Sequence, residues 1–432
     1  MPPTTQLLDE LTWRGLLYQH TEELAAALRE PRGFYAGFDP TADSLHLGHI
    51  VPVMGLVHAQ RAGHRPIALV GGGTGLIGDP SGKAAERQLI STEQVAENAR
   101  AIGVQLERFL DFTGPNAARI RDNAEWLRPL TAIELLRDVG KHFTVNFMLA
   151  KESVQSRLET GISFTEFSYM LLQAYDFLEL RRRENVTVQL GGSDQWGNMT
   201  AGMELIRRSG AGDAHVLTMP LVKTAAGTKF GKTEQGAVWL DPARTSPYKF
   251  FQFWINADDR DAGMYLRYFT LLPRAEIEEI ERESAEYPER RLAQRALAAE
   301  VTTRVHGEEA ARIAAEVSAL LFGGAEATSL SEGAVHALRS EIPYAEVALP
   351  ESGADALDLL VETKLVASRG AAKRLAEQGG VYVNGARVSM ADRMVGLERR
   401  KLLAGGHVLL RKGTRDYALV RLTGGRTADG GR

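Results

Sequence analysis

The stretch 34–50, FYAGFDPTADSLHLGHI, constrains the fold of this chain more than any other, because it predicts a strand that turns directly into a helix. Residues 34–38 are rich in aromatic residues and glycine, as expected of a short strand, and residues 39–44 are dense in turn formers. The helix is expected to begin near His46. The N–H groups and the dipole at a helix N-terminus favour a bound anion, so the stretch predicts a phosphate site.

Two histidines occupy the first turn of that helix. His46 and His49 are three residues apart and therefore lie on one side of the turn, and Gly48 between them leaves room for a ligand. The pattern indicates a nucleotide phosphate held between two imidazoles. Two other interpretations remain open. One is a metal pair, although the chain has no cysteine and no clear third ligand, and the other is a plain helix cap.

Two later segments repeat the change from strand to polar helix start. Residues 66–70 and 186–190 read as strands, and each runs into a glycine-rich polar segment. Ligands of doubly wound sheets bind outside the carboxyl ends of the strands. The expected fold class is α/β: a Rossmann-like, doubly wound parallel sheet. Helices are expected at 92–110, 117–136, 164–180 and 246–321, and a small α+β module at the C-terminus.

The loop 71–80, GGGTGLIGDP, allows three interpretations. It fits the dinucleotide fingerprint GxGxxG, but Asp79-Pro80 interrupts the helix that should follow, and no acidic strand end comes about twenty residues later. Its continuation GDPSGK resembles a P-loop that is one residue short. In the favoured interpretation Asp79 offers a carboxylate to a cation. Lys83 and Arg87, four residues apart, then suit a polyphosphate, although they could also be a solvated surface pair.

Two more segments carry candidate ligand contacts. On the apolar helix 164–180, Tyr169, Gln173 and Asp176 lie along one face, which indicates either a small polar ligand or a buried structural network. In the segment 224–234, TAAGTKFGKTE, Lys229 and Lys232 sit among glycines. Such a loop can close over phosphate and stabilise developing charge, or it is an ordinary basic loop.

Composition and charge narrow the class of protein. The 432 residues are enough for two to four domains, no run of some eighteen apolar residues predicts a membrane span, and the N-terminus does not resemble a signal peptide. The absence of cysteine is compatible with the cytoplasm. From Lys364 to the end there are 15 Lys+Arg and 5 Asp+Glu, a balance of +10 within a chain of net charge −4. This basic module indicates a polyanionic partner, or else a solvated tail.

Six motifs in order identify a family. HLGH at 46–49 resembles the HIGH signature, and KFGKT at 229–233 resembles the KMSKS signature. The other four motifs are, in chain order, YAGFDPT, GLIGDPSGK, the Tyr169/Gln173/Asp176 helix and GGSDQWGN. Over essentially its whole length the chain resembles bacterial tyrosyl-tRNA synthetases, which are class I aminoacyl-tRNA synthetases. Its C-terminal module is similar to an RNA-binding domain shared with a small-subunit ribosomal protein.

The resemblance implies roles for particular residues. The tyrosine-binding residues would be Tyr35, Asp79, Tyr169, Gln173, Asp176 and Gln195, with Tyr35 and Asp176 on the phenol. The ATP-binding residues would be Gly37, Asp39, His46, His49, Gly192, Asp194 and Lys232. The catalytic residues would be His46, His49, Lys83, Arg87, Lys229, Lys232 and Thr233. The tRNA-binding residues would be Arg207, Arg208, Lys364, Arg369, Lys373, Arg374, Arg411 and Lys412. No resident metal is expected. Ala36 stands where many relatives have cysteine, which puts one ribose contact in doubt.

The resemblance also implies the reaction and the partners. Tyrosine and ATP, with Mg²⁺, would give tyrosyl-adenylate and pyrophosphate, and the tyrosyl group would pass to the 3′-terminal adenosine of tRNA(Tyr). The catalytic domain would span 1–223, with a dimer-forming insertion near 115–185 that contains Asn123 and Trp126. A helical domain would span 224–325, a linker 326–354 and the RNA-binding domain 355–432. A cytoplasmic homodimer is expected. Two rivals remain: an inactive homologue that binds structured RNA, and a dinucleotide-dependent oxidoreductase.

Overall fold

The computed structural model describes residues 6–81, 90–158, 161–233, 236–323, 325–350, 353–395 and 402–424. The chain forms two compact units. Unit 1 comprises residues 1–245 and 256–297, and unit 2 comprises residues 246–255 and 298–432. No helix in the described ranges is both long and apolar enough to cross a bilayer.

A six-stranded sheet forms the centre of unit 1. Its strands are β1 (Gln19–His20), β2 (Gly33–Phe38), β3 (Arg65–Val70), β4 (Arg119–Asp122), β5 (Val186–Gly192) and β6 (His215–Met219). Their order is β1-β6-β5-β2-β3-β4, and all neighbouring pairs are parallel except β1 with β6. The chain passes from β2 outward through β3 to β4 and then returns to the other side of β2 for β5 and β6. The fold is therefore the doubly wound α/β class that the sequence predicts.

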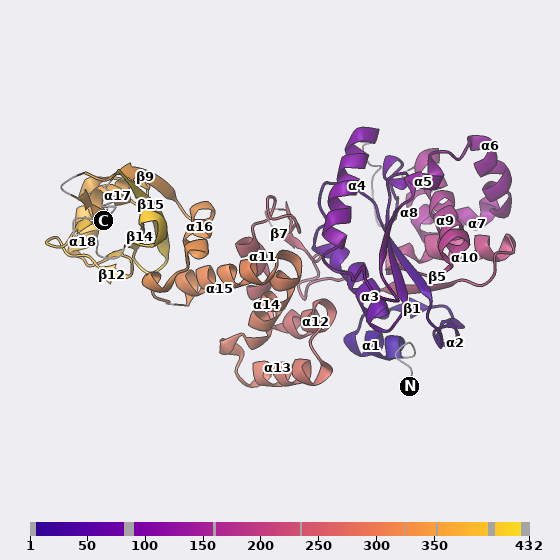
Figure 1. Cartoon of the computed structure of the whole chain (residues 1–432), viewed down its shortest axis with the longest axis horizontal. Helices are drawn as coiled ribbons and strands as arrows, with labels where there is room; N and C mark the ends of the chain where they lie inside the picture. The colour runs from indigo at the N-terminus through magenta and orange to yellow at the C-terminus, as the bar shows by residue number, and fades with distance from the viewer. Residues whose placement is uncertain are drawn as a thin grey trace, which may run out of the picture. The chain divides into compact units, whose positions relative to one another are not determined.

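Helices cover both faces of this sheet. Helices α3 (Ile50–Arg61) and α4 (Thr92–Leu106) lie on one face, and α9 (Phe164–Glu184) and α10 (Trp196–Arg208) lie on the other (Figure 1). The right-handed crossovers of parallel strands require this arrangement when the winding direction reverses. Because both faces are covered, the central strands are buried throughout; β6, for example, is buried at all five of its residues.

Smaller elements complete unit 1. They are α1 (Leu7–Arg14), α2 (Leu24–Ala27), η2 (Leu47–His49), η3 (Thr74–Leu76), α5 (Ala124–Leu127), α6 (Ala132–Glu134), η4 (Leu135–Val139), η5 (Gly140–His142), α7 (Val145–Leu149), α8 (Glu152–Leu158), η6 (Ser193–Gln195), β7 (Lys232–Thr233), β8 (Gly236–Ala237), α12 (Asp259–Phe269), α13 (Arg274–Glu286) and η7 (Pro288–Arg290). Helix α14 (Leu292–His306) begins in unit 1 and continues into unit 2.

The expectation of a helix across 117–136 is wrong. Strand β4 occupies its first part, and only the short helices α5 and α6 follow. The reason is tertiary, because β4 forms the parallel edge of the sheet beside β3, and Arg119 and Arg121 of that strand pair with Glu184 at the end of α9. Local spacing of apolar residues does not report such edge pairing.

Unit 2 contains helices and a second sheet. Its helices are α11 (Pro247–Ile255), α15 (Glu308–Phe322), α16 (Glu332–Glu341), α17 (Ala356–Glu362) and α18 (Arg369–Glu377). The strands of this sheet are, in order, β12 (Ala386–Arg387), β11 (Val381–Val383), β14 (His407–Lys412), β15 (Asp416–Thr423) and β9 (Tyr344–Ala348). A separate pair is formed by β10 (Ala354–Asp355) and β13 (Met394–Val395). The predicted hairpin after β11 is confirmed, since Asn384 and Gly385 both have positive φ, 49° and 85°.

The segment 326–354, expected as a linker, contains regular structure. Helix α16 is capped by Ser331, whose hydroxyl accepts the N–H of Ala334, and its Val335 and Leu338 are almost completely buried. Strand β9 pairs in parallel with β15. The glycine, alanine and serine content of the segment suggested a connection, but its apolar residues at helical spacing are buried against other parts of unit 2.

Candidate active site

A cavity of about 500 Å³ opens in unit 1 at the carboxyl ends of β2 and β5. These two strands flank the point where the winding direction of the sheet reverses, which is where doubly wound folds bind ligands. The cavity brings together thirteen of the predicted residues: Tyr35, Gly37, Asp39, His46, His49, Asp79, Tyr169, Gln173, Asp176, Gly192, Asp194, Gln195 and Lys229. Lys83 and Arg87 lie outside the described residues, and Lys232 and Thr233 form β7 beyond the residues that line the cavity.

Tyr35 and Asp176 form the deepest polar part of the cavity. Tyr35 is 1% exposed, and its hydroxyl has no hydrogen-bond partner within the described parts of the chain. Burial, together with the nearby Asp176, raises the pKa of the Tyr35 hydroxyl well above its usual value. Burial also raises the pKa of Asp176 to about 8. A buried hydroxyl without a partner is costly, so its presence beside a carboxylate indicates a place for a polar ligand atom.

Asp176 is held in place by two neighbours from another segment. Its Oδ2 accepts the amide of Asn123 at 2.9 Å, and its Oδ1 accepts the indole N–H of Trp126 at 2.7 Å. Both residues lie in the segment near 115–185 that is predicted to form a dimer contact, and their side chains are only 1% and 3% exposed in the protomer. Within the protomer they orient the carboxylate of Asp176. No sequence signal pointed to this, because the burial that makes these polar groups need partners is seen only in the folded chain.

A second network joins β2 to α9. The hydroxyl of Tyr169 donates to Asp39 at 2.8 Å, and Thr74 donates to the other oxygen of Asp39 at 2.7 Å. The hydroxyl of Thr74 in turn accepts Asn123, so this network continues to Asp176. Burial and the surrounding carboxylates, Asp39 first among them, raise the pKa of Tyr169. The tyrosine therefore remains a neutral hydrogen-bond donor.

Asp79, Gln173 and Gln195 meet through a residue that the sequence did not single out for the site. Asn198 is 3% exposed, and its amide nitrogen lies 3.0 Å from Gln173 Oε1 and 3.5 Å from Asp79 Oδ1. Gln195 donates to Asp79 Oδ2 at 2.7 Å. The polar run that follows β5 contains Asn198, and its burial at the start of α10 is the property that sequence spacing did not reveal.

The histidine turn, defined as residues 46–49, also contributes to the cavity through His46, Gly48 and His49. His46 Nδ1 accepts the N–H of Gly48, and His49 Nδ1 accepts the N–H of His46, both at 3.1 Å, so the pair caps η2 as one interpretation expected. The rings are stacked with their centroids 4.0 Å apart. An Nδ1 that accepts a backbone N–H carries no proton, so each neutral ring carries its proton on Nε2. Each histidine can therefore cap the helix through Nδ1 and still donate a hydrogen bond to a ligand through Nε2.

The lysine loop, defined as residues 223–232, lies next to this turn. Gly231 has φ of +75°, and a Cβ on it would stand 2.9 Å from the Cβ of Leu47. Only glycine at this position therefore lets the backbone approach the histidine turn so closely. Lys223 and Lys229 pair directly across the loop, and both line the cavity. Lys223 was not among the predicted site residues, because it precedes the KFGKT motif.

The predicted RNA-contacting residues are all described in the structure, and none of them is among the residues that line the cavity. In unit 1, Arg207 and Arg208 pair with Glu204 on the outer surface of α10. In unit 2, Arg369 pairs with Asp355 and Asp358, Lys373 with Glu377, and Lys412 with Asp416. The guanidinium of Arg411 lies 4.0 Å from the ring centroid of Tyr382. Lys364 and Arg374 are exposed.

Comparison with known proteins identifies the family. Residues 27–323 match the family described as "tRNA synthetases class I (W and Y)", and residues 335–420 match the "Tyrosine--tRNA ligase SYY-like C-terminal domain". The chain belongs to the class I aminoacyl-tRNA synthetases, in the family that contains the tryptophan and tyrosine enzymes. The second match includes residues 355–420 of the module that was expected to bind RNA.

Curated relatives extend this match over nearly the whole chain. The chain is 54% identical to the tyrosine–tRNA ligase of Anaeromyxobacter dehalogenans (96% of this chain, 99% of the relative) and 55% identical to that of Roseiflexus castenholzii (97% and 100%). Among solved structures it resembles the truncated mitochondrial tyrosyl-tRNA synthetase of Aspergillus nidulans, with a TM-score of 0.67 and 30% identity over 73% of this chain and 94% of that one. A tryptophanyl enzyme from Encephalitozoon cuniculi, at 14% identity and a TM-score of 0.51 over 72% of this chain and 88% of that one, shares the fold alone.

Proposed function

We propose that the cavity of unit 1 performs both steps of tyrosine–tRNA ligation. The family uses ATP as a substrate, and the enzyme is a ligase of the aminoacyl-tRNA synthetase class. In the first step the carboxylate of tyrosine attacks the α-phosphorus of ATP and pyrophosphate leaves. In the second step a ribose hydroxyl of the 3′-terminal adenosine of tRNA(Tyr) attacks the adenylate and AMP leaves. The observation that carries this proposal is the buried hydroxyl of Tyr35, which lies beside Asp176 without a hydrogen-bond partner in the described structure.

The phenol of tyrosine fits this pair of groups. The Tyr35 hydroxyl can donate a hydrogen bond to the phenol oxygen, and an oxygen of Asp176 can accept a hydrogen bond from the phenol hydroxyl. Phenylalanine would leave both groups buried and unpaired, which is the physical basis of strong discrimination.

The amino group of the substrate is assigned to Asp79 and the polar residues around it. Asp79 supplies the negative charge, Gln173 and Tyr169 supply polar atoms on the adjacent face of α9, and Gln195 orients Asp79 through its 2.7 Å hydrogen bond. The proposed groups for the ammonium cation and for the phenol both line this one cavity. A zwitterionic amino acid with a polar para substituent would satisfy both.

ATP is assigned to the side formed by the histidine turn and the lysine loop. Gly37, Asp39, Gly192 and Asp194 would line the nucleoside part, and His46 and His49 would donate Nε2 protons to the α-phosphoryl group. Lys83, Arg87, Lys229, Lys232 and Thr233 would stabilise the leaving pyrophosphate, which arrives as the Mg²⁺ complex of ATP. The nucleophile is already ionised, so positioning and charge stabilisation supply the catalysis.

The remaining parts of the chain are assigned to tRNA and to self-association. Residues 224–325 and 355–432 would be the helical and RNA-binding domains after the catalytic domain 1–223, with 326–354 between them, and Arg207, Arg208 and the basic residues of unit 2 would contact tRNA phosphates. A homodimer in the cytoplasm is proposed. The insertion near 115–185 exposes large apolar side chains that a second copy would cover: Ile133, Leu136, Val145, Leu158 and Phe164.

The decisive experiment is ATP–pyrophosphate exchange with each of the twenty amino acids, followed by charging of purified tRNA. Exchange with tyrosine alone and charging of tRNA(Tyr) would support the proposal. Exchange with tryptophan would show that Tyr35 and Asp176 do not read the phenol. Failure of exchange with all twenty amino acids, in protein that still binds tRNA, would favour an inactive RNA-binding homologue.

A further inference from the structure

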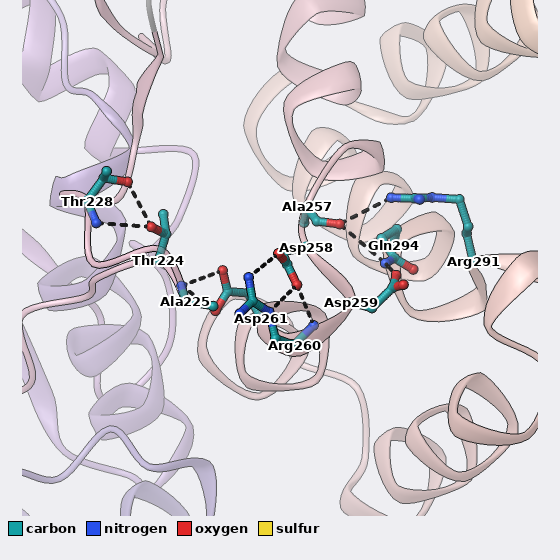
Figure 2. Close-up of polar contacts among 10 residues, drawn as sticks. All are labelled: Thr224, Ala225, Thr228, Ala257, Asp258, Asp259, Arg260, Asp261, Arg291 and Gln294. Carbon is teal, nitrogen blue, oxygen red and sulfur yellow. Dashed lines mark hydrogen bonds and ion pairs between the residues drawn. The ribbon is translucent and has the colours of Figure 1, made fainter.

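Helix α12 contacts the lysine loop at two positions. The carboxylate of Asp261 accepts the backbone N–H of Ala225 with both oxygens at 3.0 Å (Figure 2). Further along the same helix, the rings of Tyr265 and Phe269 lie 5.0 and 4.9 Å from that of Phe230. Positions 261, 265 and 269 share one face of the helix. The two contacts therefore lie on either side of Lys229 in sequence, and Lys229 and Phe230 both line the cavity.

Asp261 is buried although it carries a carboxylate. It is 6% exposed, and a carboxylate in such a place is costly unless hydrogen bonds compensate for its lost hydration. The N–H of Ala225 supplies one such bond. Burial, and to a lesser degree the charge and hydrogen bond of Asp261, raise the pKa of the Tyr265 hydroxyl. Of these two partners of Asp261, Ala225 belongs to the lysine loop, and Tyr265 is one of the aromatic residues that pack against Phe230.

The N-terminus of α12 is itself fixed to another helix. The amide of Gln294 donates to Asp259 at 2.5 Å and to the carbonyl of Ala257 at 3.3 Å, and Arg291 donates to that carbonyl at 3.1 Å (Figure 2). All these residues belong to unit 1. Asp261 consequently stands on a helix whose first turn is held by the start of α14.

The tip of the lysine loop has internal hydrogen bonds that do not depend on α12. The N–H of Thr224 donates to the carbonyl of Thr228 at 2.9 Å, and the N–H of Thr228 donates to Thr224 Oγ1 at 3.2 Å (Figure 2). Without Asp261, the tip can therefore keep its shape and yet change its position. This separates the role of Asp261 from that of a residue needed for folding of the loop.

We propose that Asp261 is a positioning residue for tyrosine activation: it holds the N–H of Ala225 and thereby sets the position of Lys229 at the cavity. The inference rests on the proposed function, in which Lys229 stabilises the leaving pyrophosphate. Asp261 itself touches no reacting atom. Its effect should therefore appear in the parameters for ATP and not in those for tyrosine.

The test compares Asp261→Ala with Asp261→Asn and with a matched control, Asp258→Ala. Asp258 lies one turn earlier, caps α12 through the N–H of Arg260 at 2.9 Å, and pairs with the Arg260 side chain. Steady-state ATP–pyrophosphate exchange would be measured while ATP and tyrosine are varied separately, and thermal unfolding would be followed in parallel. Asp261→Ala should lower kcat/KM for ATP about tenfold and leave KM for tyrosine unchanged, because one charged hydrogen bond is lost.

The two companion variants separate positioning from stability. Asp261→Asn keeps an acceptor oxygen at the same reach and should recover most of the activity lost in Asp261→Ala. Asp258→Ala should lower the unfolding temperature but leave the ATP parameters unchanged. A loss in Asp261→Ala that affects ATP and tyrosine equally, or a fall in stability with unchanged ATP parameters, would overturn the inference.

Two further measurements keep the outcome clear. If Lys229→Ala leaves exchange unchanged, the proposed role of the lysine loop fails and the inference about Asp261 fails with it. If Lys229→Ala is impaired while Asp261→Ala is not, only the inference fails. Should Asp261→Ala not fold, hydrogen exchange of the unmodified protein decides: we expect protection of the Ala225 amide, and exchange as fast as in an unfolded peptide would contradict the contact.

Discussion

The proposed phenol side of the cavity and its proposed phosphate side differ in how their polar groups are held. The phenol side consists of Tyr35, Asp176 and the two donors to Asp176, Asn123 and Trp126, and all four are at most 3% exposed. Their geometry is fixed before a ligand arrives. Such a site discriminates strongly, because a ligand that lacks the correct polar atom leaves buried groups unpaired.

The phosphate side consists of His46, His49, Lys223 and Lys229. The two lysines are exposed and the two histidines are partly exposed, so these groups keep much of their hydration until a polyanion enters. The lysine loop is fixed by backbone contacts, such as that of Ala225 with Asp261, and not by burial of its charges. The difference teaches that selectivity for the amino acid requires desolvated partners, whereas stabilising a transient charge requires correctly placed donors.

The largest effect is expected from Asp176→Ala. The variant removes the acceptor for the phenol and leaves the donors of Asn123 and Trp126 unpaired, so kcat/KM for tyrosine should fall about 10³-fold. Exchange kinetics with varied tyrosine would measure this. Glu179→Ala is the matched control, since Glu179 is a buried carboxylate on the same helix that pairs with Arg182 and Arg183 outside the cavity. Equal losses in both variants would contradict a specific role for Asp176.

A smaller loss, about 100-fold in kcat, is expected from His49→Ala, because a donor to the transition state is removed. His49→Asn retains an acceptor near the position of Nδ1, so it should keep the cap on the N–H of His46 while losing the Nε2 proton. Both variants should be equally slow, but only His49→Ala should unfold at a lower temperature. Recovery of kcat in His49→Asn would show that the histidine acts through the cap alone.

Tyr35→Phe should produce a change of about tenfold in kcat/KM for tyrosine, since one neutral hydrogen bond is lost. The same variant should be more stable by about 1 kcal/mol without ligand, because a buried hydroxyl without a partner in the described structure is removed. Thermal unfolding and exchange with tyrosine and phenylalanine would measure both effects. A less stable variant would show that the hydroxyl has a structural partner and is not reserved for substrate.

The same contrast decides what the sequence could predict. Strands β2, β3 and β5 and helix α9 follow from local patterns, and helix spacing puts Tyr169 and Asp176 on one face of α9. Strand β4 does not follow from such a pattern, and Tyr35 was assigned through the family resemblance alone. The hydrogen-bond partners do not follow from local patterns. Asn123 lies 53 residues from Asp176 along the chain, and Asp261 lies 36 residues from Ala225, so only the folded chain reveals either contact.

The smallest effect is expected from Lys223→Ala, and it sharpens the contrast most. Lys223 and Lys229 are directly opposite each other across the lysine loop, where like charges repel unless an anion lies between them. Removing one of them should raise KM for ATP only about threefold, since exposed charges remain screened by water. Exchange with varied ATP at low and high salt would measure this, and Lys141→Ala, an exposed lysine outside the cavity, is the control.

We expect the effect to shrink at high salt, in contrast to that of Asp176→Ala, because salt screens exposed charges but not buried hydrogen bonds. An effect of Lys223→Ala that is independent of salt would indicate that this lysine becomes buried when the loop closes on ATP.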